Sequence, residues 1–147
     1  MILISHRGNI NGPSKDENNP IRIEDVILQG YDVEIDLRIL NSEFYLGHDT
    51  EDYKVSEKWI LKHKDKLWIH CKTIDTIQQI HNSKLLGDTN YFFHDNDKCT
   101  LTSKGFLWVF PGFQPIQNSI SVLPELKDEN ISKSIGICSD FIKRYEK

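Results

Sequence analysis

Short apolar runs and strict alternation of hydrophobic with polar residues dominate this chain, and both patterns predict β-strands. Residues 2–5 form the first apolar run, residues 31–40 alternate with a period of two, and Glu43–Leu46 is a short return strand after a turn. Residues 67–72 form the next run. Four more strand-like runs follow in the second half of the chain, and they are residues 91–93, 105–110, 119–123 and 134–138.

Helical spacing of apolar residues is largely confined to the first half of the chain. It predicts short helices at residues 23–29, 55–63 and 73–82, and only residues 140–146 look helical near the end. The later connections are too short for full helices, and parallel crossovers normally need a dozen or more residues. We therefore expect some strands within residues 90–125 to be antiparallel or to form a hairpin.

Polar residues collect where the predicted strands end. His6 and Arg7 follow the first strand, and the loop after them carries Glu17. Period two puts Glu34 and Asp36 on the same face of the second strand. Functional groups gather at the carboxyl ends of parallel strands, and three carboxylates there would suit a hard cation such as Mg²⁺ or Ca²⁺. The alternative is that the alternating charges simply line the solvent face of an amphipathic strand.

A second histidine, His48, follows the short return strand and is expected to come back to the neighbourhood of the carboxylates. Imidazole titrates near neutrality and can exchange a proton with an alcohol oxygen. His6 and His48 together therefore suggest an acid and a base for phosphoryl chemistry, although a single loop histidine would carry no such implication.

The order His-Arg-Gly, Glu-Asn, Gly-Tyr-Asp-Val-Glu-Ile-Asp, Gly-His-Asp resembles the glycerophosphodiester phosphodiesterase family, within the phospholipase-C-like phosphodiesterases. The resemblance is clear over residues 3–49. It implies a TIM-type barrel and cleavage in which a neighbouring substrate hydroxyl can give a cyclic phosphodiester before water enters. The implied roles are His6 and His48 as general acid and base, Arg7 on the phosphate, and Glu17, Glu34 and Asp36 as ligands of a divalent metal.

One position departs from the family's pattern. The family would place Glu-x-Lys at the end of the run at residues 67–72, with the Glu on the metal and the Lys near the phosphate. Lys72 fits, whereas His70 stands where the Glu would be. One divalent cation is expected, Mg²⁺, Ca²⁺ or Mn²⁺, with Zn²⁺ as an option if His70 is a ligand. The alternative is that His70 is a strand-end imidazole satisfied by a neighbour.

Further residues of the loops and predicted strand ends are candidates for lining a substrate pocket, and they are Asn18, His94, Trp108, Glu125 and Asp140. Core packing is the favoured alternative for Trp108, because large aromatic residues mostly supply buried area. The alternative for Asp140 is a helix N-cap.

The chain has 147 residues, whereas a TIM barrel usually takes about 250. We therefore expect one α/β domain over residues 1–147, a small, eroded or incomplete TIM-type β/α barrel with few helices in its C-terminal half. A shortened barrel would leave an exposed sheet edge or apolar flank, so a homodimer is a further expectation.

Composition restricts the partners. The formal charge of −4 and the pI near 5.8 argue against a nucleic-acid surface, which draws on clustered Lys and Arg. Three cysteines without metal-type spacing predict free thiols in a reducing compartment. The first strand leaves no room for a signal peptide, and no apolar run approaches membrane-spanning length, so we expect a cytoplasmic protein without a membrane partner.

The expected function is metal-dependent hydrolysis of a small soluble phosphodiester. Two alternatives stay open at this point. One is a catalytically weak or inactive phosphoester-binding module on the same fold, favoured by the small size and by His70. The other is a different lyase or hydrolase acting on a phosphorylated sugar or nucleotide sugar, because a fold does not fix its substrate.

Overall fold

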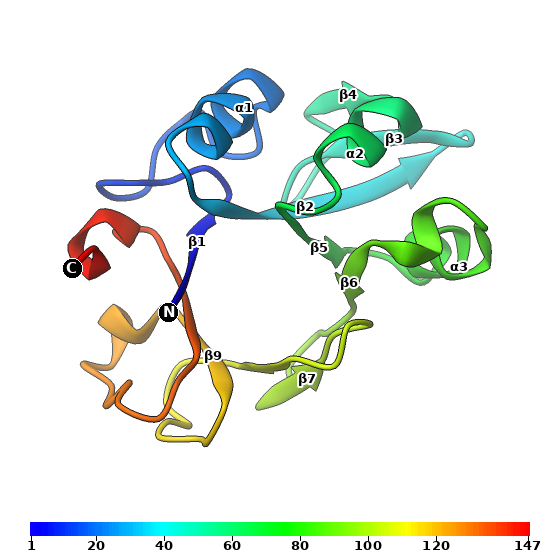
Figure 1. The fold of residues 1–147 in the computed structure, drawn as a ribbon. Coiled ribbons are helices and arrows are strands. Elements are labelled where there is room, and N and C mark those ends of the chain that lie inside the picture. Colours follow the sequence, from blue (N-terminus) through cyan, green and yellow to red (C-terminus); the bar gives the residue numbers. More distant parts are fainter.

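All ten strands of the computed structural model, which describes residues 1–147, belong to one curled sheet. The strands are β1 (Ile2–His6), β2 (Asp32–Leu40), β3 (Glu43–Leu46), β4 (Tyr53–Val55), β5 (Leu67–Cys71), β6 (Asn90–Phe92), β7 (Cys99–Leu101), β8 (Leu107–Val109), β9 (Ser119–Val122) and β10 (Gly136–Ser139). The helices are α1 (Pro20–Leu28), α2 (Glu57–His63) and α3 (Ile74–Asn82). Figure 1 shows the strands following one another around a ring, with the three helices outside it.

Parallel pairing connects most of the sheet. The order β6, β5, β2, β1, β10, β9, β8 is parallel throughout, whereas β3 and β4 extend β2 as an antiparallel meander and β7 pairs with β8 in an antiparallel hairpin. The hairpin within residues 90–125 is therefore confirmed. No backbone ladder joins β6 to β8. The molecule is a mixed α/β protein with a curled sheet, consistent with a partial barrel.

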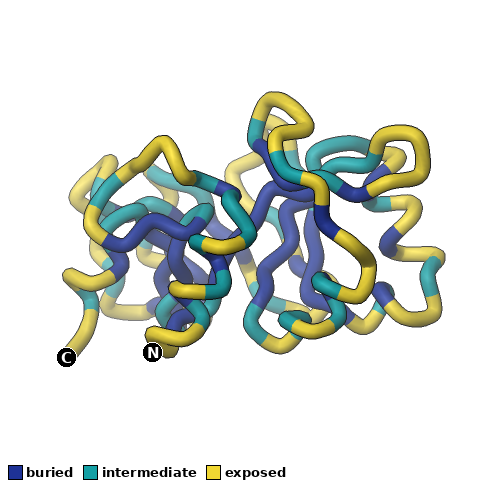
Figure 2. The backbone as a smooth tube through the Cα atoms, turned by 90° about the horizontal axis from the view of Figure 1, so that it is seen from above, coloured by how far each residue is buried: buried dark blue, intermediate teal, exposed yellow.

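The inner and outer faces of the curled sheet form two separate hydrophobic clusters. The inner cluster comprises Ile4, Trp68, Phe92, Trp108, Ile120, Val122 and Cys138. The outer cluster includes Val33, Ile35 and Leu37 of β2, which pack together with buried residues of the helices. Figure 2 shows this buried layer of strands between exposed loops. The period-two alternation of β2 thus sends its apolar residues to the helices and its acidic residues to the inside.

Trp108 belongs to the inner cluster and is 2% exposed. Its ring lies 4.8 Å from that of Phe92 and 5.6 Å from that of Trp68. These contacts join β8 to β6 and β5 across the interior. Trp108 is therefore a core residue, which is the alternative that the sequence favoured, and it lines none of the pockets described below.

Each helix of the first half begins at a polar cap. Asn19 accepts a hydrogen bond from the backbone N–H of Ile21, and Pro20 follows at the first helical position. Ser56 caps α2 and Thr73 caps α3 in the same way. The three predicted helices are confirmed, but Val55 lies in β4 rather than in α2. None of the helices has the length and apolar character that crossing a bilayer requires.

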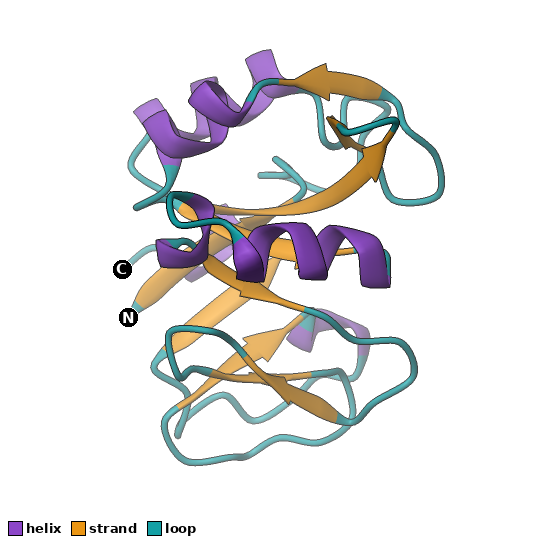
Figure 3. Cartoon of the chain, turned by 90° about the vertical axis from the view of Figure 1, so that its right-hand side faces the viewer, coloured by secondary structure: helices purple, strands orange, loops and turns teal.

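The second half of the sheet has loops and single 3₁₀ turns where helices would otherwise pack (Figure 3). Polar contacts replace apolar helix packing there. The buried hydroxyl of Ser119 donates to the carbonyl of Ile116, and that of Ser121 bonds the hydroxyl of Ser134 at 2.7 Å. Residues 140–146, predicted as helical, contain only a 3₁₀ turn. The expectation of few helices in the C-terminal half is thus confirmed.

Candidate active site

Strand register brings four of the predicted site residues to one end of the interior. The parallel pairing of β1 with β2 sets His6 opposite Glu34, and that of β2 with β5 sets Asp36 opposite His70. All four residues lie at or near the carboxyl end of the aligned part of their strands. Because their neighbours in sequence face the helices, these side chains share the inner face.

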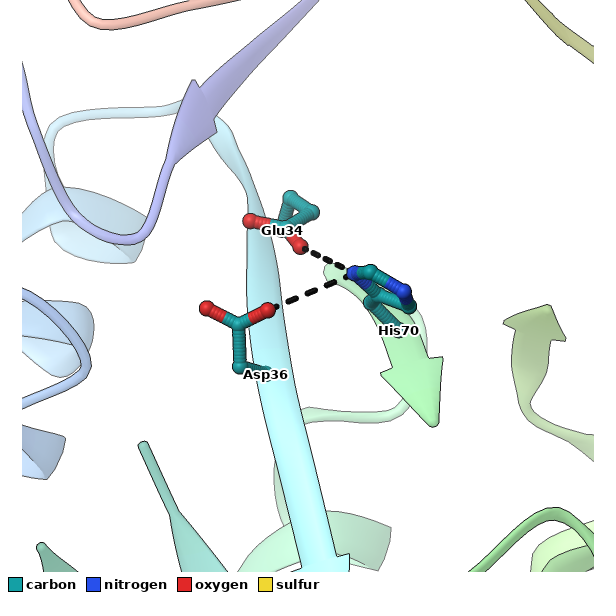
Figure 4. Close-up of side chains that lie close together, drawn as sticks. All are labelled: Glu34, Asp36 and His70. Atoms are coloured by element: carbon teal, nitrogen blue, oxygen red, sulfur yellow. Dashed lines mark ion pairs between the residues drawn. The ribbon is translucent and has the colours of Figure 1, made fainter. Parts of the chain in front are cut away.

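Glu34, Asp36 and His70 form a buried group (Figure 4). The Nδ1 atom of His70 lies 3.3 Å from Oδ1 of Asp36 and 3.7 Å from Oε1 of Glu34. One ligand atom from each residue lies within 4.8 Å of the others. The ammonium of Lys72, at the end of β5, is 3.5 Å from Oδ1 of Asp36.

His6 is held by the carboxylate of Asp140, which directly follows the neighbouring strand β10. Its Nδ1 atom lies 2.7 Å from Oδ1 of Asp140, and its Nε2 atom lies 3.8 Å from Oε2 of Glu34. Burial lowers the pKa of His6, but the hydrogen bond with Asp140 and the charge of Glu34 outweigh this effect, and the pKa is raised. The pKa of Asp140 is lowered, because the bond with His6 outweighs burial, which would raise it. The protonated imidazole is thereby favoured.

Asp140 is itself fixed by two neighbours. Nδ2 of Asn9 donates to its Oδ1 at 2.8 Å, and its backbone N–H donates to Oε1 of Glu125 at 3.1 Å. Glu125, predicted as a pocket residue, thus acts on Asp140 rather than lining either pocket of the site. Asp140 does not cap a helix, since the 3₁₀ turn that follows has Phe141 at its cap position without a side-chain bond.

Arg7 and Asn18 hold the other side of Asp36. Both adopt left-handed backbone conformations, with φ of 55° and 61°, and the N–H of Asn18 donates to the carbonyl of Arg7. Nε of Arg7 lies 2.9 Å from Oδ2 of Asp36, and Nδ2 of Asn18 donates to the same oxygen at 2.9 Å. Burial would raise the pKa of Asp36, but His70, Arg7 and Lys72 hold it well below its usual range.

Glu17 lies apart from the group of three. Its carboxylate accepts from Nδ2 of Asn9 at 2.8 Å and lies 3.3 Å from a terminal nitrogen of Arg7. The left-handed turn at Asn18 directs the Asn18 amide, rather than the Glu17 carboxylate, to Asp36. Of the predicted metal ligands, the structure therefore groups Glu34 and Asp36 with His70.

His48 is the most exposed of these residues, with 42% of its side chain accessible. Its Nδ1 atom lies 2.8 Å from Oδ1 of Asp49, and its backbone carbonyl accepts from Arg38. It has no hydrogen bond or ion pair with His6 or the buried carboxylates. The fold brings His48 to the rim of the site rather than into the buried network.

Two pockets meet at His48. The first, of about 490 Å³, is lined by Arg7, Ser14, Lys15, Glu17, Asn18, His48, Asp49, Thr50, Asp52 and Tyr53. The second, of about 540 Å³, is lined by His48, Lys72, Thr73, Ile74, Phe93, His94 and Asp95. The two cations predicted to contact a phosphate, Arg7 and Lys72, therefore open onto different pockets that share His48 as a wall.

His94 packs between the site and the interior. Its ring lies 4.3 Å from that of His70 and 3.9 Å from that of Phe110. Burial, together with the charges of His70 and Lys72, lowers the pKa of His94 to about 4. The imidazole of His94 is therefore neutral near pH 7 and serves as a flat, weakly polar wall.

The group of three fits a divalent cation because one ligand atom of each residue lies within 4.8 Å of the others. Oδ1 of Asp36, which faces Nδ1 of His70, is buried and makes no hydrogen bond. Two ionised carboxylates match the charge of a divalent ion, and buried charges are normally paired or bound to a metal. Burial lowers the pKa of His70, but the interactions with Asp36 and Glu34 raise it more, so a metal ion bound by Nδ1 would take the place of a proton there.

Two contributions to the site were missed by sequence reasoning. The sequence gives no role to Asn9 in the first loop, yet its side-chain amide donates to both Glu17 and Asp140. Asp140 was not predicted as the partner of His6, because 134 positions separate them and only the pairing of β1 with β10 brings them together. No local sequence signal marks either contact.

Comparison of the chain with protein-family models, with curated proteins and with solved structures found no match in any of the three. The function must therefore be inferred from this chain's own residues.

Proposed function

We propose that this protein is a metal-dependent phosphodiesterase, similar to the glycerophosphodiester phosphodiesterases and built on a small, incomplete TIM-type barrel, and that it hydrolyses a small soluble phosphodiester. The observation that carries the proposal is the convergence of a partly buried His6–Asp140 pair with the buried group of Glu34, Asp36 and His70 at one end of parallel strands. Acid and base groups, cations and a metal-binding set at such an end are what phosphoryl transfer requires.

His6 is proposed as the general acid. Because Asp140 holds Nδ1, Nε2 is the atom left to exchange a proton with a substrate oxygen. The raised pKa favours the protonated ring, which suits donation to the leaving alcohol. His48, at the accessible wall between the pockets, is proposed as the base that takes the proton of the attacking hydroxyl.

Arg7 and Lys72 are proposed to bind the phosphate. They contact different oxygens of Asp36 and open onto different pockets, so the phosphate of a diester spanning the pockets would lie within reach of both. A divalent cation held by Glu34, Asp36 and His70 would polarise the phosphoryl oxygens and acidify the attacking hydroxyl.

The two pockets suggest where the alcohol groups would lie. The first pocket is lined almost entirely by polar side chains, among them Ser14, Lys15 and Asp52, which suits a polyol group. The second includes Ile74 and Phe93 and suits a less polar alcohol. When the polyol carries a hydroxyl next to the phosphate, that hydroxyl attacks, the other alcohol leaves with a proton from His6, and water then opens the cyclic diester.

Hydrolysis assays test this proposal. The purified protein is incubated with Mg²⁺, Mn²⁺, Ca²⁺ or Zn²⁺ and a panel of glycerol, sugar and nucleotide phosphodiesters. His6→Ala should lower turnover about 100-fold or more, whereas His81→Ala, which removes an imidazole bonded to Tyr91 away from the site, should leave it unchanged. Equal turnover by wild type and His6→Ala would contradict the role of His6.

One observation favours a second function, a phosphoester-binding module without competent catalysis. His48, the proposed base, is bonded only to the neighbouring Asp49 and the rim backbone, so nothing orients it toward His6. Calorimetry with glycerol phosphate and aryl phosphates distinguishes the two functions. Phosphoester binding that needs no metal, together with no turnover of any diester, would favour the module.

The same proposal places the protein in the cytoplasm, acting on soluble diesters, with no nucleic-acid or membrane partner. Cys71, Cys99 and Cys138 are all free thiols, which accords with a reducing compartment. A secreted protein of this size would more often be stabilised by disulfides.

A further inference from the structure

We propose that Glu34, Asp36 and His70 bind a first-row transition-metal ion such as Mn²⁺ or Zn²⁺ in preference to Mg²⁺ or Ca²⁺, with Nδ1 of His70 as a direct ligand. This inference rests on the metal dependence of the proposed function and goes beyond it, because it fixes the class of cation and gives His70 a role. The inference depends on His70, which stands where the glycerophosphodiester phosphodiesterases would have a glutamate.

The three side chains point at one position. Nδ1 of His70 lies 3.3 Å from Oδ1 of Asp36 and 3.7 Å from Oε1 of Glu34 (Figure 4). Adjacent ligands of one ion, each about 2.0 to 2.6 Å from it, are separated by roughly 3.0 to 3.7 Å. The two separations from His70 therefore match a shared ion, and the ligand atoms of Glu34 and Asp36 lie within 4.8 Å of each other. These distances admit several metals, so the choice among metals depends on the donor atoms.

The donor set favours a transition-metal ion over Ca²⁺ or Mg²⁺. Calcium takes six to eight oxygen ligands and magnesium prefers octahedral oxygen. Imidazole nitrogen suits zinc, and manganese, the first-row ion closest to magnesium in its preference for oxygen, accepts it more readily than magnesium does. Glu17, the third carboxylate predicted for the site, is paired with Arg7 and Asn9 instead. The side chains facing the centre therefore provide two carboxylates and one nitrogen.

The imidazole is held in the orientation that a ligand needs. His70 is buried, and its ring stacks on two neighbouring rings, that of Phe92 at 5.1 Å and 14° and that of His94 at 4.3 Å and 18°. Phe110 packs against His94, with ring centroids 3.9 Å apart. Rotation of the His70 ring away from the carboxylates would break this stack. Packing that fixes a ligand before the ion arrives strengthens metal binding.

Isothermal titration calorimetry of Mn²⁺, Zn²⁺, Mg²⁺ and Ca²⁺ tests the preference without requiring any turnover. Wild type should bind Mn²⁺ at least about 10-fold more tightly than Mg²⁺, and His70→Glu, which restores an all-oxygen set, should reduce that ratio about 10-fold or more. His81→Ala is the matched control, because it removes an imidazole that lies outside the site. An unchanged Mn²⁺ to Mg²⁺ ratio in a folded His70→Glu variant would overturn the proposal.

Pulsed electron paramagnetic resonance of the Mn²⁺-loaded protein tests the ligand directly. Wild type and His81→Ala should show a ¹⁴N coupling, and the neutral variant His70→Asn should lose it. A wild-type spectrum without nitrogen coupling would refute the proposal even if every His70 variant failed to fold. Hydrolysis supported equally by Mg²⁺, with no nitrogen coupling, would refute this inference and leave the proposed phosphodiesterase standing.

Discussion

The pairing of His6 with Asp140 concentrates the proposed chemistry in one side-chain contact. Asp140 accepts at its Oδ1 from both Asn9 and the His6 ring, and Glu125 anchors its backbone. A carboxylate placed in this way fixes the tautomer and orientation of an imidazole, so that one nitrogen alone faces the substrate. Asp140 is therefore a positioning residue, because its effect on the reaction passes through His6.

Asp140→Asn tests that role. The amide keeps the size of the side chain but removes the charge that orients His6, so we expect kcat to fall about 10- to 100-fold with little change in KM. Asp128→Asn is the control, because it makes the same change at an exposed residue outside the two pockets at His48. It should leave kcat and KM unchanged. A variant with wild-type kcat would remove Asp140 from the mechanism.

The three thiols are expected to react very differently. Burial raises the pKa of Cys71 to about 12 and that of Cys138 well above its usual value, whereas Cys99 is exposed on β7. Since the thiolate is the reactive form, titration of dilute native protein with a disulfide reagent should detect one rapidly reacting thiol, and denaturation should reveal all three. Rapid reaction of a second thiol in the native protein would show that the interior opens readily.

At the level of elements, the sequence predicts the first half of the fold well. Period two in β2 and the caps at Ser56 and Thr73 are local signals that act within a few residues, and the structure contains the corresponding strand and helices. The grouping of Glu34 with Asp36 follows from the same periodicity. Local pattern therefore determines which side chains share a face of one strand.

The remaining features depend on contacts between distant segments. Asp140 reaches His6 only because β1 pairs with β10, and the hairpin partner of β8 is set by tertiary packing of very short strands. Glu17 departs from the metal group because Asn18 adopts a left-handed conformation, which no spacing rule predicts. Sequence reasoning fails at these points because short strands and polar loops carry weak local preferences.

Gly136 begins β10, and its lack of a side chain leaves room for residues of the two flanking strands, β1 and β9. A Cβ added there would lie 2.6 Å from Cδ1 of Ile120 and 3.0 Å from Cβ of Ile2, on the two flanking strands. Gly136→Ala should therefore lower the free energy of unfolding by about 1 to 3 kcal/mol, measured by urea denaturation. Gly87→Ala is the control, since its added Cβ would meet only ordinary contacts, the closest at 3.5 Å. Equal stability of the two variants would contradict this packing.

At the level of the whole molecule, helices protect one half of the sheet and loops protect the other. On the outside of β9 the buried residues are serines bonded to nearby loops, so this half needs no apolar helix to cover it. The exception is the β7–β8 hairpin at the end of the sheet. Leu101 and Leu107 are direct cross-strand neighbours there and are 62% and 37% exposed.

A second copy of the chain is expected to cover this hairpin. β7 pairs only with β8, so its other side offers free backbone groups beside an exposed pair of leucines, which together favour strand-to-strand association. Size-exclusion chromatography with light scattering at micromolar concentration should give twice the chain mass of 17.2 kDa, and Leu101→Lys should return the protein to the single mass. Cys99, two residues earlier on the same face of β7, should then react more slowly as concentration rises.

Leu28→Lys provides the control for this prediction. Leu28 is 85% exposed at the end of α1, on the half of the molecule that the helices cover, so this substitution adds the same charge at an exposed leucine away from the hairpin. It should leave the dimer intact. A single-chain mass for wild type, or an equal effect of the two lysine variants, would show that the exposed leucine pair is not an interface. The edge strand β7 would then be too short to associate with another chain, and the protein would be a monomer.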